Sequence, residues 1–154
     1  MSNKLHIIKY NPKYFSILKA FTKEFQTTEK KFYADRDTSE KKILELTKQL
    51  NSKEDKGTLF LGLVNEELIG YVHASVQEDK DNKSPCYYVN DLFITKEYQA
   101  NGYGTELLKY IHTYAKSKGY KYLGIGVLYN NLKALKLYKK IGFKDYGIEL
   151  IKKI

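Results

Sequence analysis

The chain has 154 residues, of which 42% are hydrophobic and 29% charged, and it carries a formal net charge of +9 with one cysteine, Cys86. These values fit one domain, residues 1–154, with its own hydrophobic core, and they exclude a disordered chain and a scaffold held by internal disulfides. The N-terminal apolar patch is too short for a signal peptide or a membrane span, so a cytoplasmic protein without a membrane partner is expected.

The positive charge raises the question of a nucleic-acid partner. Among 27 basic residues Arg36 is the one arginine, and the lysines are spread along the chain with acids between them. Proteins that read nucleic acids favour arginine, whose planar side chain grips phosphates and guanine edges. A compositional bias toward lysine therefore explains the charge better, and a basic nucleic-acid-binding domain is kept as the weaker alternative.

The N-terminal part predicts one strand followed by two helices. Leu5–Lys9 reads as the strand. After it, Pro12 suits the first turn of a helix whose apolar residues recur at helical spacing. A second helix is predicted to begin near Asp37, which with Glu40 forms a capping box.

The middle of the chain predicts three strands. Residues 57–64 (GTLFLGLV) and 67–76 (ELIGYVHASV) are two apolar strands, joined at Asn65-Glu66 in a hairpin. A polar loop follows, and residues 87–95 (YYVNDLFIT) then form a strongly apolar third strand.

The C-terminal part alternates helix and strand. Gly102 and Gly104 open a helix that Gly119 ends, in the position expected of a C-terminal glycine. The further predicted elements are a strand over 122–128, a helix from near Asn131, and short strands over 143–146 and 148–151. The order predicts a mixed sheet with helices on its faces and a parallel, right-handed crossover from the strand at 87 to the strand at 122.

The two glycines at a helix start point to a close approach of some other group to the main chain. First-turn N–H groups lack intrahelical partners, and glycine lets several of them converge on an anion such as a diphosphate. A P-loop fits worse because Thr105-Glu106 follows Gly104, and a dinucleotide fingerprint fits worse because Leu107 replaces its third glycine. A plain strand-to-helix turn remains the simple alternative.

Three blocks in order, Val89–Ile94, Gln99–Thr105 and Asn131–Phe143, resemble the GNAT superfamily of acyl-CoA-dependent N-acetyltransferases. They match its central strand, its Gln/Arg-x-x-Gly-x-Gly/Ala loop and its Asn-x-x-Ala-x-x-Leu-Tyr…Gly-Phe segment. The resemblance covers about Gly57 to Tyr146. It implies an α/β (α+β) fold, with a mixed, mostly antiparallel twisted sheet of about six or seven strands, a splayed central parallel pair and about four flanking helices.

The resemblance also implies a cofactor site in the opening between the splayed strands. Acetyl-CoA would lie there as co-substrate, with its pantetheine on the main chain of Leu92, Phe93 and Ile94. Its diphosphate would lie on the glycine loop, which comprises Gln99, Ala100, Asn101, Gly102, Tyr103, Gly104 and Thr105. Asn131 would contact the cofactor, or act only as a helix N-cap, or do both. No spacing of Cys and His predicts a metal site.

Tyr138 matches the family tyrosine that lies beside the thioester sulfur and acts as general acid, although a structural aromatic is the simpler role for its residue type. The general base departs from the family pattern, because Asn90 stands where many relatives have Glu. Asn90 can position water or substrate but cannot accept a proton. Asp91 is a candidate base, yet strand alternation predicts that it points away from Asn90 and Leu92. His73, on the neighbouring strand, and ordered water are the other candidates.

The acceptor implied by the resemblance is an amine-bearing small molecule or protein. Phe32, Tyr33 and Asp35, with Asp37 beyond them, are candidate acceptor contacts, because aromatic rings and carboxylates suit a cation. A homodimer is compatible with the family. A GNAT-fold module that binds CoA and regulates without catalysis is the main rival to the enzyme, and Asn90 is the residue that supports it.

Overall fold

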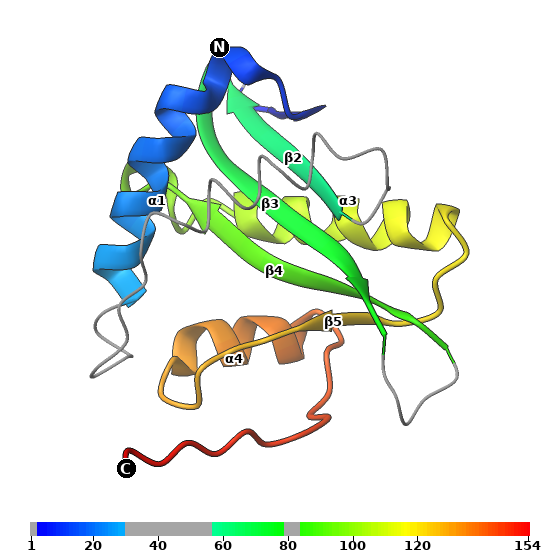
Figure 1. Cartoon of the computed structure of the whole chain (residues 1–154). Coiled ribbons are helices and arrows are strands. Elements are labelled where there is room, and N and C mark those ends of the chain that lie inside the picture. The colour runs from blue at the N-terminus through cyan, green and yellow to red at the C-terminus, as the bar shows by residue number, and fades with distance from the viewer. Residues whose placement is uncertain (1–2, 30–56, 79–83) are drawn as a thin grey trace.

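The structure, a computed structural model, describes residues 3–29, 57–78 and 84–154, and its centre is a five-stranded mixed sheet. The strands are β1 (Leu5–Lys9), β2 (Gly57–Val64), β3 (Glu67–Gln77), β4 (Cys86–Ile94) and β5 (Leu123–Ile125). They lie in the order β1-β2-β3-β4-β5, antiparallel up to β4, whereas β5 runs parallel to β4 (Figure 1). The predicted mixed, mostly antiparallel sheet is therefore confirmed, with somewhat fewer strands in the described ranges than expected.

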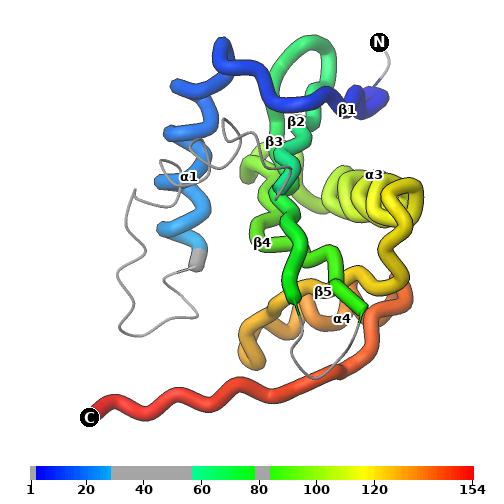
Figure 2. The backbone as a smooth tube through the Cα atoms, turned by 45° about the vertical axis from the view of Figure 1, so that its right-hand side comes forward, coloured from blue at the N-terminus to red at the C-terminus, as the bar shows by residue number. Residues whose placement is uncertain are grey.

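Helices cover both faces of this sheet. The turn η1 (Pro12–Tyr14) leads into α1 (Phe15–Glu29), η2 (Lys96–Tyr98) precedes α3 (Tyr103–Ser117), and α4 (Leu132–Lys140) follows β5. Seen close to edge-on, the sheet has α1 on one side and α3 on the other (Figure 2). The second helix predicted from Asp37 lies outside the described residues.

Each face of the sheet has its own apolar cluster. On the α3 side, Leu107, Leu108, Ile111 and Ala115 of the helix pack with inward side chains of the strands, which include Phe60, Val64, Ile69, Val72, Tyr87 and Val89. On the α1 side, Leu18 and Phe21 pack with Leu59, Leu61, Leu63, Leu68, Tyr71 and Phe93. Because both faces of β2 and β3 are buried, these strands read as nearly continuous apolar runs.

Two predicted turns are confirmed by their backbone angles. Asn65 and Glu66 both have positive φ, 50° and 68°, as a two-residue turn of type I′ requires, and Val64 pairs with Glu67 across it. Gly119 has a φ of 89° and follows the C-cap Lys118 of α3, which is where a glycine ends a helix most easily.

The C-terminal strands were predicted wrongly. No strand is assigned between residues 143 and 154, and the strand predicted over 122–128 is reduced to Leu123–Ile125. Large apolar side chains of this segment are exposed: Tyr146, Ile148, Leu150, Ile151 and Ile154. Alternation indicates that a segment can be a strand, but burial against a neighbouring strand is what stabilises it, and this segment gains none in the described structure.

A β-bulge in β4 changes which side chains share a face. His73 of β3 pairs with Asp91, while the next residue, Ala74, pairs with Val89, so Asn90 has no partner on β3. An extra residue of this kind breaks the alternation of side chains at one point. The bulge lies where β4 passes the end of its pairing with β5, next to the site described below.

Glu24 of α1 fixes the start of the loop that follows β4. Its carboxylate accepts hydrogen bonds from Thr95 Oγ1 and the Lys96 N–H, both at 2.9 Å. We expect Glu24→Ala to lower the free energy of unfolding by about 1 kcal/mol, because charge-assisted bonds near the surface contribute modestly. Urea denaturation should detect the change. Glu24→Gln, which keeps one acceptor oxygen, should lower the free energy of unfolding by less. An unchanged midpoint in Glu24→Ala would mean that these contacts do not anchor the loop.

Candidate active site

The site begins where β4 and β5 separate. The two strands pair only through Tyr87↔Leu123, Tyr88↔Gly124 and Val89↔Ile125, and β5 then ends while β4 continues to Ile94. Beyond that point the strands diverge (Figure 1). Within the described residues the β5-facing edge of β4 from 90 to 94 therefore has no strand partner, and its peptide groups are available to an extended ligand.

The same edge leads to the first turn of α3, which carries the glycine loop. Ala100 and Gly102 have φ of 63° and 83°, so the chain curls twice in the left-handed region before the helix. For alanine this conformation is uncommon and costs about 1 kcal/mol or more. The N-cap Gly102 has no capping side chain, and the N–H groups of Tyr103, Gly104 and Thr105 donate to no group in the described part of the chain.

Side chains hold this loop in shape. Gln99 Nε2 donates to the Ile94 carbonyl at 2.9 Å, and Asn101 Nδ2 donates to the carbonyls of Tyr98 and Gln99, each at 3.1 Å. The Tyr103 ring is buried, and its hydroxyl donates to the Asn3 carbonyl at 2.9 Å. The side chains of Gln99, Asn101 and Tyr103 thus have structural partners, which leaves the main chain of the loop available to a ligand.

The three strand residues assigned to the cofactor differ in what their side chains do. Phe93 is buried in the α1-side cluster, with its ring centroid 5.2 Å from that of Phe21, so only its peptide groups can reach a ligand. Leu92 and Ile94 lie on the α3 side. A Cβ on Gly104 would lie 3.9 Å from a side-chain carbon of each, so this glycine faces the strand edge directly.

Two residues of α4 complete this side of the opening. Asn131 is the N-cap of α4, since its Oδ1 accepts the Ala134 N–H at 3.3 Å, which establishes the capping role. Tyr138 is partly buried against the α3-side cluster, and its ring packs edge-on against Phe143 with centroids 6.0 Å apart. Its hydroxyl forms no hydrogen bond to any described residue, so it is free to donate to a ligand.

Burial raises the pKa of Tyr138 above the ordinary tyrosine value of 10.0. A phenol that acts as an acid must be protonated, and a raised pKa keeps it protonated to higher pH. If Tyr138 is the acid, we expect kcat to show no alkaline loss from this group below about pH 10. A pH profile of kcat for wild type and Tyr138→Phe tests this, and a loss near pH 8 present only in wild type would contradict it.

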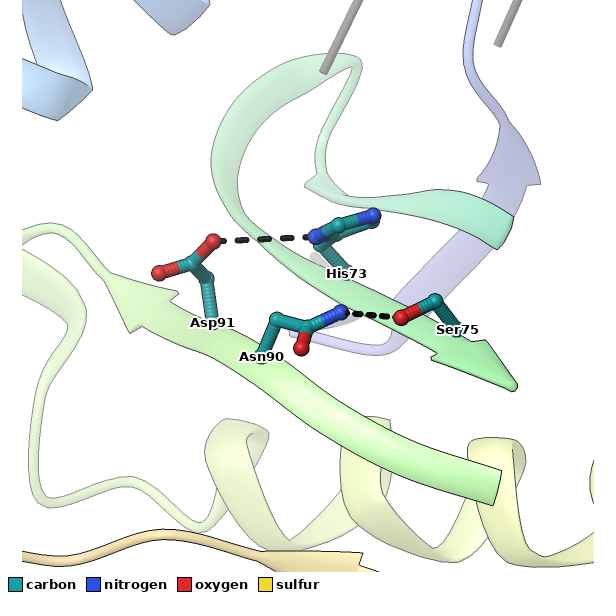
Figure 3. Close-up of polar contacts among 4 residues, drawn as sticks. All are labelled: His73, Ser75, Asn90 and Asp91. Atoms are coloured by element: carbon teal, nitrogen blue, oxygen red, sulfur yellow. Dashed lines mark hydrogen bonds and ion pairs between the residues drawn. The ribbon is translucent and has the colours of Figure 1, made fainter. Parts of the chain in front are cut away.

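On the opposite face of the sheet, four polar side chains gather around the bulge (Figure 3). Asn90 Nδ2 donates to Ser75 Oγ at 2.7 Å, and Asp91 Oδ2 lies 3.7 Å from His73 Nδ1. His73 and Ser75 alternate on β3 and so share one face. The prediction that Asn90 and Asp91 point to opposite faces is therefore wrong: the bulge turns both toward β3. Asp91 and Leu92 do point to opposite faces, as predicted.

His73 is an unusual member of this group because it is buried without a hydrogen bond. Its side chain is 8% exposed and that of Asp91 17%. Neither ring nitrogen of His73 has a hydrogen-bond partner in the described structure, since the 3.7 Å to Asp91 is an ion-pair distance and too long for a direct bond. A buried polar atom without a partner costs about 1–3 kcal/mol.

Sequence reasoning did not single out Tyr88, which lies next to the point where β4 and β5 separate. A Cβ on Gly124 would fall 2.7 Å from its ring, and a Cβ on Gly126 would fall 2.5 Å from its hydroxyl oxygen. The ring therefore lies across β5 and reaches past the point where the strands part. The available signal was the repeated glycine in the Gly124-Ile125-Gly126 stretch, which makes room for this ring.

The predicted acceptor residues Phe32, Tyr33 and Asp35, with Asp37, lie outside the described residues. Among the residues that are described, no group of three or more His, Cys, Asp or Glu side chains is placed to hold a metal ion. No helix in those ranges combines the length and apolar character needed to cross a membrane.

Comparison with known proteins gives a family match, a curated relative and two solved structures. Residues 16–143 match the family described as Acetyltransferase (GNAT) family. A curated relative, the probable spermine N(1)-acetyltransferase of Bacillus subtilis subsp. natto (strain BEST195), is 30% identical over 112 residues, or 71% of each chain. A solved structure, a putative acetyl transferase from Pyrococcus furiosus, superposes with a TM-score of 0.79 over 98% of this chain and all of that chain, at 23% identity.

A second solved structure shares the fold at lower identity. The aminoglycoside N-acetyltransferase AAC(6')-Iy, in complex with CoA, superposes with a TM-score of 0.77 at 13% identity and covers 100% of this chain and 97% of that one. At this identity the likeness extends to the fold alone.

Proposed function

This chain belongs to the acetyltransferase (GNAT) family, and on that premise we propose that it transfers an acetyl group from acetyl-CoA to an amine. One observation supports the proposal more than any other. The unpaired edge of β4 leads directly to the first turn of α3, where the N–H groups of Tyr103, Gly104 and Thr105 are without partners in the described structure. An extended pantetheine followed by a diphosphate has the shape and charge that such a surface recognises.

Each part of the site has a role in this proposal. The main chain of Leu92 to Ile94 binds the pantetheine arm, and the loop from Gln99 to Thr105 binds the diphosphate through its peptide N–H groups. Because Ala100 and Gly102 already hold the left-handed conformation, the loop needs little reorganisation to bind an anion. Asn131 combines its capping role with a contact to the cofactor.

The chemistry requires a neutral amine and a stabilised thiolate. An alkylamine with a pKa of about 10.4 is almost wholly protonated at pH 7, and removing its proton costs about 4–5 kcal/mol. Tyr138 donates its hydroxyl proton to the departing sulfur, a comparatively easy task because a free thiol has a pKa of about 8.5. The base side of the reaction is therefore the more demanding one.

The acceptor is assigned by class only, as a primary amine. The curated relative is described as a probable spermine N(1)-acetyltransferase, and a structural neighbour as an aminoglycoside N-acetyltransferase. A polyamine is the first acceptor to test, because Asp91 provides a carboxylate on the face opposite α3. Aminoglycosides, lysine analogues and peptides with a free N-terminus complete the panel.

The experiment is a screen of this amine panel with acetyl-CoA, with thiol release and the mass of the product both recorded. We expect an increase of 42 Da in at least one amine, the mass that replacing a hydrogen by an acetyl group adds, with equimolar release of CoA. Calorimetry with acetyl-CoA runs in parallel. Binding of acetyl-CoA without turnover of any amine would favour the regulatory module, for which Asn90 at the family's Glu position is the supporting residue.

A further inference from the structure

The buried imidazole of His73 is not explained by packing alone. It lies in the α1-facing side of β3, 8% exposed, with neither ring nitrogen bonded to a described residue. Apolar side chains fill the neighbouring positions on this face, Tyr71 and Leu59 among them. A leucine would satisfy such an environment at lower cost, so the presence of a histidine points to a task that needs its polar atoms.

The position of His73 relative to Asp91 indicates what that task is. Nδ1 faces Asp91 Oδ2 at 3.7 Å, whereas a Cβ on Gly57 would lie 3.4 Å from Nε2, so the second nitrogen points away from β4 toward the start of β2 (Figure 3). The nitrogen that faces the site is therefore Nδ1. Asp91 belongs to β4, the strand whose β5-facing edge is proposed to bind the cofactor.

The bulge determines which face a charged acceptor uses. The α3 side of β4 at Leu92 is filled by the apolar cluster, which would exclude an ammonium group. Ser75, Asn90 and Asp91 are all on the other face, and Asp91 is the residue next to Leu92 in the chain. An amine that approaches a thioester at this edge from the face opposite α3 thus comes from the side of the sheet that carries Asp91.

We propose that Asp91 is the group that takes the proton from the acceptor ammonium and that His73, whose Nδ1 lies 3.7 Å from Asp91 Oδ2, is its positioning residue. This rests on the proposed function. Asn90, at the family's Glu position, cannot accept a proton, and the bulge moves the adjacent carboxylate to the same face to do so. Asn90 itself is fixed by Ser75 and orients the amine or a water molecule.

The proton balance is closed without any further reactant. The ammonium gives one proton to Asp91, and the neutral amine then forms the new N–C bond at the thioester carbonyl as the C–S bond breaks. The electron pair of that bond leaves with sulfur, which takes a proton from Tyr138. Tyr138 recovers a proton from the nitrogen, directly or through water, and Asp91 releases its own proton to solvent. The products are the amide, the free thiol and one proton.

The test compares acceptors that do and do not need a base. We expect Asp91→Asn to lower kcat/KM about 100-fold for the best strongly basic amine of the panel. With 2,2,2-trifluoroethylamine, which is already neutral at pH 7.5, Asp91→Asn should lower kcat/KM less than about threefold, because no proton has to be removed before attack. An equal loss with both acceptors would overturn the base assignment.

Three substitutions separate positioning from packing at His73. We expect His73→Leu to lower kcat for the basic amine about tenfold while the melting temperature stays within about 2 °C or rises, because a buried, unpartnered ring is lost. His73→Asn, whose Nδ2 lies near the place of Nδ1, should restore most of kcat. The matched control is His112→Gln, an exposed histidine of α3, which should change neither quantity.

The outcomes distinguish this inference from the proposed function. If wild type acetylates no amine, the proposed function fails, and this inference fails with it. If wild type is active and His73→Leu keeps full kcat, only this inference is overturned. It is also overturned if His73→Leu loses all activity together with several degrees of melting temperature and His73→Asn does not restore the activity, because the pair is then structural.

Discussion

Replacing Gly104 by valine is expected to weaken acetyl-CoA binding about 100-fold, because one or two N–H bonds to charged oxygens, each contributing about 1.5–3 kcal/mol, are lost when a branched side chain enters the loop. The Cβ of this residue would face the edge of β4, 3.9 Å from carbons of Leu92 and Ile94, which is ordinary contact distance. The free protein therefore has room for the added Cβ, whereas in the proposed complex the branched side chain would occupy space that the cofactor needs. Calorimetry with acetyl-CoA measures the effect directly.

The folded state should tolerate this substitution. Gly104 lies within α3 and is not among the glycines with positive φ, and valine is a better helix former than glycine. The matched control is Gly147→Val in the C-terminal segment, where an added Cβ meets nothing within 4 Å. We expect that control to bind acetyl-CoA as wild type does. Unchanged affinity in Gly104→Val would show that the diphosphate does not lie on this loop.

Tyr138→Phe is expected to lower kcat by about tenfold to 100-fold, the lower part of the range for acid catalysis, because thiolate is a good leaving group. The affinity for acetyl-CoA should change little, since the hydroxyl acts on the sulfur only as it departs and the ring remains in place. Steady-state kinetics with the best amine, together with calorimetry, measures both quantities.

The packing of Tyr138 provides the control for this prediction. Its ring contacts Phe143 and the α3-side cluster, and phenylalanine preserves those contacts. Phe143→Leu, which disturbs the ring's neighbour and keeps the hydroxyl, should retain a larger share of kcat. If Tyr138→Phe were as active as wild type, proton delivery to sulfur would have to come from another group.

Local patterns predicted those parts of the fold that depend on neighbours in sequence. The buried stripe of α3, the cap at Asn131, the hairpin at Asn65-Glu66 and the glycine that ends α3 each follow from a short motif with its own physical cause. The glycine loop belongs to this class, because a curled helix start can be read from Gly102 and Gly104. The partner of Gln99 could not be read in this way, since it is the carbonyl of Ile94 at the end of β4.

The features that were missed depend on pairing between distant segments. In β4, Val89 and Phe93 lie four residues apart, yet they face opposite sides of the sheet because the unpaired Asn90 intervenes. Both faces of the strand are apolar, so the sequence pattern is the same with or without the bulge. The prediction of the C-terminal strands is wrong for a related reason, because strand propensity alone does not provide a neighbouring strand to pair with.

A crystal structure of the protein with CoA bound is the most direct measurement of the central claim, that the start of α3 and the free edge of β4 form one acetyl-CoA site. The predicted result has the diphosphate within hydrogen-bonding distance of the N–H groups of Tyr103, Gly104 and Thr105, and the sulfur beside the Tyr138 hydroxyl. A structure with CoA bound elsewhere, or with these N–H groups facing only solvent, would contradict it.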